Sequence, residues 1–277
     1  MMDSVKSIYW RALGLYKRFR RIHSEAAGDA HQCDIAKQSP SWPFAKIVDP
    51  REWRRLTRKR SAHEIIEEIR RDMVRSLSGK RQQTWYRHEK MVMDIGECAQ
   101  GVSSPGFCGR LLYGLIREFR PRCVVEFGSA FGIASMYIVQ ALKQNRSGVM
   151  KGIEYENWRA DIANEALSTH WSNLANVYPG RVEDVFPSLV GNGEEVDFCF
   201  VDAVHRYEDC VGYHNILKDH LVKGAIVVYD DINWSADMQK FWQFVISEEV
   251  ITDAVLVDGR WGIARYGSAT LFEAKNA

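Results

Sequence analysis

The sequence predicts an α/β fold in which a mostly parallel sheet is covered by helices on both faces. Four short apolar runs, at residues 124–127, 149–153, 196–201 and 225–229, alternate with helical patterns. Strands that are apolar throughout are expected where helices cover both faces of a parallel sheet. Near the C-terminus, two strand-like runs meet at Asp258-Gly259, which is a strong hairpin signal. We therefore expect the sheet to finish in an antiparallel hairpin, unlike a plain dinucleotide-binding fold.

The composition is typical of a globular protein with a substantial core, since 46% of the 277 residues are hydrophobic and 26% are charged. The formal net charge of +1 gives no reason to expect a nucleic-acid partner. None of the six cysteines forms a CxxC pair, so neither a zinc site nor a disulfide framework is indicated. The sequence has no run of transmembrane length and no apolar signal-peptide core, and we expect a cytoplasmic protein.

Residues 1–94 are predicted to form a mainly helical N-terminal extension, and residues 95–277 the α/β domain. Residues 4–23 form a basic amphipathic stretch. Such a helix either packs on its own domain or a neighbouring subunit, or lies on a membrane surface. We favour packing, which would suit a homodimer, and keep peripheral membrane contact as the alternative.

The rest of the extension has one irregular and one helical part. Residues 24–50 contain one glycine and three prolines and are interpreted as a linker or wrapping arm. Residues 61–79 predict a helix, because Ser61 precedes Glu64 by three positions, as in a capping box, and apolar residues recur on one face. A second helix is predicted before Pro121.

Helical patterns separate the predicted strands of the domain. They occupy residues 134–144, 158–167 and 207–221, and a further helix is predicted at about residues 236–247. Gly224 is a good helix stop before the apolar run that follows it. Phe241 and Trp242, in the last helix, are expected to lie in the core.

The first strand of the domain ends in a glycine-rich turn that runs from Glu126 to Gly132. A strand that stops at such a turn before a helix places backbone N–H groups where a ligand can approach closely. Ala130 holds the middle position and the last glycine is displaced, so the pattern is not the GxGxxG of dinucleotide folds. This argues against an NAD oxidoreductase and predicts a different ligand at the turn.

Carboxylates follow the predicted strand ends, where ligands of an open parallel sheet bind. They are Glu126, Glu154, Glu183, Asp184, Asp202, Asp230 and Asp231. Any one of them could be a helix N-cap, and for Asp184 that interpretation is as good as a ligand role. Together they would repel one another unless something positive lay between them. Asp202, Asp230 and Asp231 offer the hard oxygen ligands that suit magnesium, calcium or manganese.

The ordered set of motifs resembles class I S-adenosylmethionine (SAM)-dependent O-methyltransferases, especially the metal-dependent catechol-type and macrolide-sugar-type branches. The segments that carry the resemblance are GSAFGIAS, GIEYE, GRVEDVFPSL, FVDAVHRYE and GAIVVYDDINW. It covers about residues 95–277 and implies a Rossmann-like class I methyltransferase sheet that binds SAM.

The resemblance also implies a role for each candidate cofactor residue. The assignments are Glu126, Gly128, Ser129 and Gly132 around the methionine part of SAM, Glu154 at the ribose, Glu183 and Asp184 at the adenine, and Asp202 beside the cofactor. The first motif departs from the usual pattern only in having Ala130 as its middle residue.

For the chemistry, the resemblance implies that Asp202, Asp230 and Asp231 bind a divalent cation, with Mg²⁺ preferred, and that His205 is the general base. The catechol-type branch uses a lysine as base, for which this chain has no clear counterpart, so a sugar or another aliphatic hydroxyl is the favoured acceptor. Trp234, just after the aspartate pair, is interpreted either as a wall for the acceptor or as packing at the rim of the sheet.

The leading hypothesis is thus a SAM-dependent O-methyltransferase acting on a hydroxyl of a sugar or a natural-product-like small molecule, assisted by a divalent metal and by His205. One alternative keeps SAM without the metal. Another is a non-catalytic SAM-binding protein that docks on a membrane or a glycan through its basic N-terminus.

Overall fold

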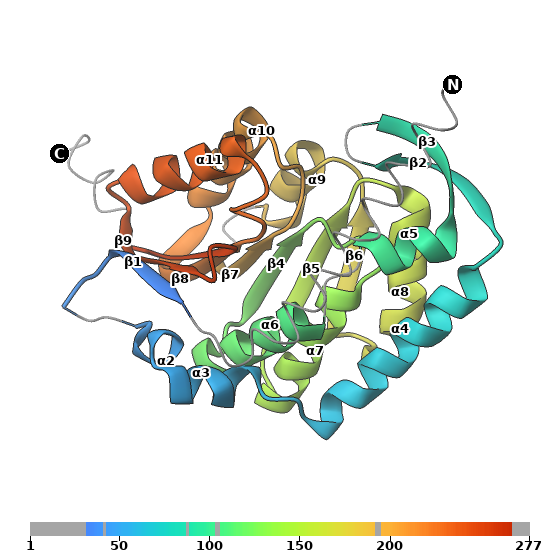
Figure 1. Cartoon of the computed structure of the whole chain (residues 1–277), viewed down its shortest axis with the longest axis horizontal. Coiled ribbons are helices and arrows are strands. Elements are labelled where there is room, and N and C mark those ends of the chain that lie inside the picture. The colour runs from blue at the N-terminus through green and yellow to red at the C-terminus, as the bar shows by residue number, and fades with distance from the viewer. Residues whose placement is uncertain (1–31, 41–42, 87–88, 103–105, 192–194, 268–277) are drawn as a thin grey trace.

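Figure 1 shows a computed structural model of the chain, which describes residues 32–40, 43–86, 89–102, 106–191 and 195–267. The basic amphipathic helix predicted at residues 4–23 lies outside these residues. Within the described ranges, no helix is both long and apolar enough to cross a membrane.

An eight-stranded sheet lies at the centre of the fold, in the order β1-β9-β10-β8-β7-β4-β5-β6. The strands are β1 (Cys33–Lys37), β4 (Cys123–Phe127), β5 (Val149–Glu154), β6 (Ala175–Pro179), β7 (Val196–Val201), β8 (Leu221–Tyr229), β9 (Ile251–Val257) and β10 (Trp261–Tyr266). The pairs among β4, β5, β6, β7 and β8 are parallel. The β9–β10 hairpin is antiparallel and pairs with β8, which confirms the predicted mixed sheet.

Helices cover both faces of the sheet (Figure 1). One face carries α9 (Val182–Leu189), α10 (Tyr207–Lys218) and α11 (Ala236–Ser247), and the other carries α6 (Gly106–Phe119), α7 (Ile133–Asn145) and α8 (Asn157–Trp171). In β4, Val124 packs in the core on one face and Val125 in the core on the other, both fully buried. Burying such a side chain contributes roughly 1.5–3 kcal/mol, which explains why these strands are apolar throughout.

The first element that the structure describes in the N-terminal extension is a strand. The segment predicted to be irregular contains β1, which pairs antiparallel with β9, with Cys33 opposite Val257. The strand has only five residues, and its apolar Ile35 is half exposed. A strand this short and this exposed leaves no clear alternating pattern in the sequence, which is why it was not predicted. The extension therefore contributes an edge strand to the same sheet as the C-terminal hairpin.

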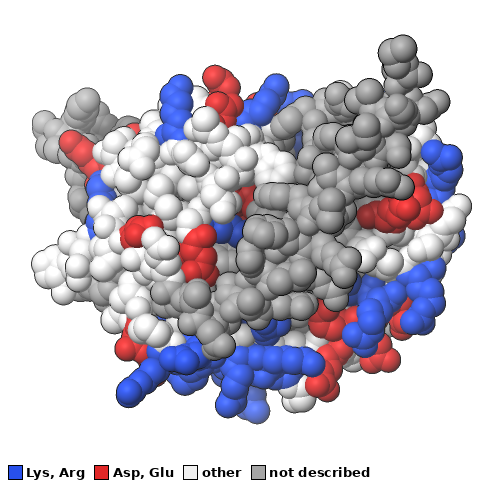
Figure 2. All heavy atoms as spheres, in the orientation of Figure 1, with Lys and Arg blue, Asp and Glu red and all other residues white. Residues whose placement is uncertain are grey.

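The helices of the extension follow β1. Those described are α2 (Ala45–Val48), α3 (Pro50–Thr57), the 3-10 turn η1 (Ser61–His63) and α4 (Glu64–Leu77), and α5 (Ile95–Val102) follows at the predicted start of the domain. The helix predicted at residues 61–79 begins as the 3-10 turn, in which the Arg60 N–H donates to Nδ1 of His63 (3.3 Å), rather than with the Ser61–Glu64 capping box. Basic side chains of this region gather along the lower edge of Figure 2, where Figure 1 places α2 and α3.

A β-hairpin that the sequence did not predict, β2 (Arg81–Tyr86) with β3 (Glu89–Asp94), lies between α4 and α5. It packs against the N-terminal part of α8. Nη2 of Arg159 donates to Oγ1 of Thr84 (2.5 Å), and Oε1 of Glu156 accepts from the Trp85 N–H (2.8 Å). The hairpin is thereby fixed next to the carboxyl end of β5.

Candidate active site

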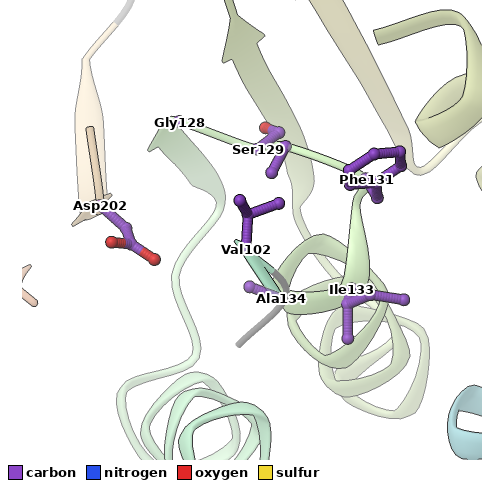
Figure 3. A pocket seen from close by; sticks show the side chains of 8 residues that line it. Val102, Gly128, Ser129, Phe131, Ile133, Ala134 and Asp202 are labelled. Atoms are coloured by element: carbon purple, nitrogen blue, oxygen red, sulfur yellow. The ribbon is translucent and has the colours of Figure 1, made fainter. Parts of the chain in front are cut away.

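A pocket lies at the carboxyl end of β4, where the glycine-rich turn leads into α7 (Figure 3). It is lined by Val102, Gly128, Ser129, Ala130, Phe131, Ile133, Ala134 and Asp202. Figure 3 shows the Asp202 side chain across the pocket from the turn. Three of the predicted cofactor residues, Gly128, Ser129 and Asp202, thus share one pocket.

The turn is held in an unusual backbone conformation. Gly128 has φ +91° and Ala130 has φ +47°, a left-handed conformation that costs a non-glycine residue roughly 1–2 kcal/mol. The N–H groups of Gly128 and Ser129 both donate to the carbonyl oxygen of Ile153, at 2.9 and 3.1 Å. The Ala130 N–H donates to Oε2 of Glu154 (2.8 Å). These bonds to the end of β5 offset the strain and fix the turn.

Glu126 is fully buried behind the turn. Its Oε2 accepts hydrogen bonds from Oγ of Ser129 (2.7 Å) and Oγ of Ser135 (2.5 Å). Within the part of the chain that the structure describes, Oε1 has no hydrogen-bond partner. Burial raises the pKa of Glu126 to about 7, against the opposing effect of the two hydroxyl donors. A buried carboxylate oxygen without a donor is suited to a cationic ligand group.

Gly132 serves the packing of the helices. It has φ +76° and precedes α7, and a Cβ on it would lie 3.0 Å from Cβ of Ala163 in α8. The pocket lining described above does not include Gly132. Among the residues described, its contribution to the cofactor site is the close approach of α7 and α8.

Glu154 lies where predicted, at the end of β5, and is almost fully buried. Besides the Ala130 N–H, it accepts the Glu156 N–H through Oε1 (3.0 Å), and Nη1 of Arg159 lies 3.8 Å from the same oxygen. Burial raises the pKa of Glu154, and the Arg159 charge and the two backbone donors oppose that shift. The carboxylate therefore connects the glycine turn, β5 and α8.

The predicted adenine residues, Glu183 and Asp184, lie in the first turn of α9 and are exposed. Glu183 pairs with Arg181 on the surface, with Oε1 and Nη2 2.6 Å apart. The Gly180 N–H donates to the main-chain oxygen of Glu154 (2.9 Å), which brings this end of β6 beside β5. Neither acidic side chain is part of the pocket lining described above.

Three predicted residues meet beyond the ends of β7 and β8. The ligand atoms of Asp202, His205 and Asp231 all lie within 4.8 Å of one another. Nε2 of His205 is 3.6 Å from Oδ1 of Asp202 and 3.7 Å from Oδ2 of Asp231. Nε2 is shielded from solvent and has no hydrogen-bond partner in the described residues. Since Asp202 also lines the pocket, this cluster adjoins the predicted cofactor site.

The backbone of Asp231 is strained. It has φ +57°, in the left-handed region, and its N–H donates to Oδ1 of Asp230 (2.7 Å). Its carbonyl oxygen accepts from the Trp234 N–H (2.9 Å). Strain of this kind persists only where the surroundings fix it, and it is concentrated at functional sites.

Asp230, the remaining member of the predicted metal set, has a different partner. Both of its carboxylate oxygens accept from Arg260, Oδ1 from Nε and Oδ2 from Nη2, each at 2.6 Å. Asp230 is 1% exposed, so this two-point ion pair is buried. Nε of Arg260 also lies 3.2 Å from Oδ1 of Asp231. The structure thus brings Asp202 and Asp231 together with His205 and pairs Asp230 with Arg260.

Arg260 is a site residue that our sequence analysis did not identify. It lies in the β9–β10 turn, and its carbonyl oxygen accepts from the Ile232 N–H (2.9 Å). The hairpin was predicted, but its pairing partner was not. Because β10 pairs antiparallel with β8, with Gly262 opposite Tyr229, the turn lies against the end of β8. Aligning the hairpin on β8 is the step that would have found Arg260.

Burial and mutual repulsion perturb the titration of the cluster. Burial raises the pKa of Asp202 to about 7, with a further contribution from Asp230, while His205 opposes the shift. Burial alone would lower the pKa of His205, but the neighbouring carboxylates, above all Asp202, raise it above its ordinary value. Groups this close titrate as a unit.

Of the three aromatic residues considered in the sequence analysis, Trp234 lies beside His205 and the other two lie in the core. The ring centroid of Trp234 is 6.0 Å from that of His205, and Trp234 is partly exposed, so it borders the cluster. Phe241 and Trp242 are buried in the core, as predicted.

Comparison with known proteins agrees with this geometry. A protein family described as a methyltransferase domain matches residues 125–232, which run from β4 to just beyond the Asp230–Asp231 pair. No curated protein matches the chain.

Solved structures share the fold. The O-methyltransferase TomG from Streptomyces achromogenes, involved in tomaymycin synthesis and solved with SAM, is 20% identical, with a TM-score of 0.56 over 77% of this chain and 92% of that one. An O-methyltransferase from Bacillus cereus in complex with SAH is 17% identical, with a TM-score of 0.53 over 76% and 93%. The SAH-bound Podospora anserina methyltransferase PaMTH1 is 15% identical, with a TM-score of 0.57 over 76% and 89%.

Proposed function

We propose that this chain is a SAM-dependent methyltransferase whose domain includes residues 125–232, and that its acceptor is a hydroxyl group of a small molecule such as a sugar or a natural product. The observation that carries the proposal is the position of His205. Its Nε2, without a hydrogen-bond partner in the described part of the chain, adjoins Asp202, and Asp202 also lines the pocket at the glycine turn. This position supports His205 as a base next to the proposed methyl donor.

The residues that line the pocket and the two buried carboxylates behind the glycine turn fit SAM. The buried Oε1 of Glu126 offers a carboxylate oxygen to a cationic amino group, and the Gly128–Ala130 turn allows the close approach of a ligand to the backbone. Glu154 offers a buried carboxylate for hydroxyl groups of a ribose. When bound, SAM supplies an electrophilic methyl group on a positively charged sulfur. Asp202 then places negative charge on that side of the pocket.

In this proposal His205 removes the proton of the acceptor hydroxyl. A neutral imidazole is needed for this, and Nε2 is the ring nitrogen directed between the two carboxylates. As the proton arrives, Asp202 and Asp231 stabilise the positive imidazolium that forms. The ring of Trp234 next to His205 offers an apolar face against which a sugar or aromatic acceptor would stack.

A metal-assisted form of the same reaction is the second candidate, and the spacing of the donor atoms favours it. Asp202, Asp231 and His205 would hold a divalent cation, since their ligand atoms lie within 4.8 Å of one another. Such a cation would lower the pKa of a coordinated hydroxyl. Asp230 would not contribute, because Arg260 takes both of its oxygens. In this form His205 is a ligand and not the base.

Transfer of a labelled methyl group from SAM to a panel of sugars and phenols tests the proposal. We expect His205→Asn to bind SAH as the wild type does, measured by calorimetry, but to lose transfer by about 10²–10⁴-fold. His170→Asn, on α8 and remote from the cluster, is the matched control and should retain full activity. If His205→Asn transfers the methyl group at the wild-type rate, His205 is not the base. If no hydroxyl in the panel is methylated, the proposed acceptor class is wrong.

A chelator separates the two forms of the reaction. Transfer that persists in EDTA favours removal of the proton by His205 alone. Transfer that is lost in EDTA and returns with Mg²⁺ favours the metal-assisted form.

A further inference from the structure

Arg260 is the cation that the acidic cluster already contains. Its guanidinium makes two parallel hydrogen bonds to Asp230, at 2.6 Å each, and lies 3.2 Å from Asp231. The side chain is 12% exposed, and its guanidinium carbon stands 5.0 Å from the ring centroid of Trp261. A two-point pair of this kind is geometrically specific as well as strong.

This pair removes a ligand from the predicted metal set. Mg²⁺ prefers oxygen ligands in an octahedral arrangement. With both oxygens of Asp230 engaged, the cluster as formed by the described residues offers the carboxylates of Asp202 and Asp231 together with an imidazole nitrogen. The positive charge beside Asp231 also opposes the approach of a second cation to that carboxylate.

The main chain holds Arg260 at this position. The Arg260 N–H donates to Val257, and its carbonyl oxygen accepts from Ile232, each at 2.9 Å. The turn between β9 and β10 is therefore tied to the loop that carries Asp231. The guanidinium is an integral part of the site and not a mobile surface group.

We propose that Arg260 is a positioning residue that acts as the resident cation of the cluster. By binding Asp230 it keeps that carboxylate from binding a metal, and it weakens divalent-cation binding at Asp202 and Asp231. The acceptor site can then work without a metal. The inference rests on the proposed hydroxyl methylation for its catalytic meaning. Its cation-binding part can be measured with no acceptor present.

Direct binding of Mn²⁺, followed by electron paramagnetic resonance, tests the first part. We expect the wild type to bind Mn²⁺ only weakly, in the millimolar range, and Arg260→Met to bind it at least tenfold more tightly because Asp230 becomes available. The double variant Arg260→Met/Asp230→Asn should return to weak binding. SAH calorimetry and a thermal melt show whether each variant is folded.

The single variant Asp230→Asn tests whether Asp230 is a metal ligand, even if Arg260→Met fails to fold. The proposal expects Mn²⁺ binding to stay weak in this variant. Micromolar binding by the wild type that Asp230→Asn abolishes would overturn the proposal, since Asp230 would then be a ligand. Equal Mn²⁺ affinity of the wild type and a folded Arg260→Met would overturn it as well.

Chemical rescue tests the catalytic part. We expect Arg260→Ala to lose transfer at least tenfold and to regain part of it with millimolar guanidinium, whereas a purely structural role would give no rescue in a folded variant. Transfer by the wild type that requires Mg²⁺ would overturn this part. If no acceptor hydroxyl is methylated at all, the proposed function fails while the Mn²⁺ experiment still decides the role of Arg260.

Discussion

Gly128 lies so close to Asp202 that a Cβ atom on Gly128 would stand 2.3 Å from the carbonyl oxygen of Asp202. The Asp202 N–H also donates to the carbonyl oxygen of Phe127 (2.9 Å). The glycine turn and the acidic cluster are thus joined through the main chain. A residue at position 128 with any side chain would move both the cofactor pocket and the carboxylate beside His205.

We predict that Gly128→Ala weakens SAH binding at least tenfold and destabilises the protein by more than about 2 kcal/mol. The backbone φ of +91° strains any other residue, and the clashing atom belongs to the rigid main chain. Calorimetry and a thermal melt measure the two effects. Gly212→Ala is the control: it lies in α10 with no atom within 4 Å of the added Cβ, and should be neutral or slightly stabilising. Equal behaviour of the two variants would contradict the prediction.

Glu154→Gln tests the carboxylate at the end of β5. The amide keeps the shape of the side chain but removes the charge that holds the Ala130 N–H and, in our proposal, the ribose hydroxyls. Hydrogen bonds to a charged group are worth about 1.5–3 kcal/mol, so we expect SAH affinity to fall about 10–100-fold. Glu165→Gln, on the exposed side of α8, should leave the affinity unchanged. An unchanged affinity in Glu154→Gln would place the ribose elsewhere.

A buried polar network on the opposite face of the sheet from α7 stabilises the fold. The Tyr266 hydroxyl lies 2.8 Å from the Tyr229 hydroxyl and 3.0 Å from Nδ1 of His214. We predict that Tyr266→Phe costs about 0.5–1.5 kcal/mol of unfolding free energy, because Tyr229 and His214 each lose one hydrogen bond but keep the one between them (3.0 Å). A denaturant titration measures this. Tyr155→Phe, which alters an exposed side chain, should cost nothing measurable, and a comparable loss there would argue against the network.

The sequence contained enough information for most of the sheet, because β4, β5, β7 and β8 each carry a run of buried apolar residues that few polar residues interrupt. It did not predict the β2–β3 hairpin, whose pairing buries Thr84 against Arg159 of a distant helix and leaves Val92 exposed. Such a hairpin depends on tertiary contacts more than on a local pattern.

Part of the candidate site was also predictable from the sequence. Asp202, His205 and Asp231 follow strand ends and meet, whereas the metal set that the sequence analysis proposed was Asp202, Asp230 and Asp231. The pairing of Asp230 with Arg260 was not predictable from spacing along the chain, since it depends on the register between β8 and β10.

The pH dependence of transfer tests the base directly. The neighbouring carboxylates outweigh burial and raise the pKa of His205 above its ordinary value near about 6.5. Only the neutral imidazole can accept a proton, so we expect kcat/KM to rise with pH through a midpoint above about 6.5 and then to level off. Asp231→Asn should move this midpoint down, since one of the carboxylates that raise the pKa is removed. Asparagine tolerates the left-handed backbone at this position, so the change is confined to charge. Asp237→Asn, at the exposed start of α11, should leave the midpoint in place. A midpoint that is the same in the wild type and in Asp231→Asn would show that the coupled group of His205 and Asp202 does not control the rate.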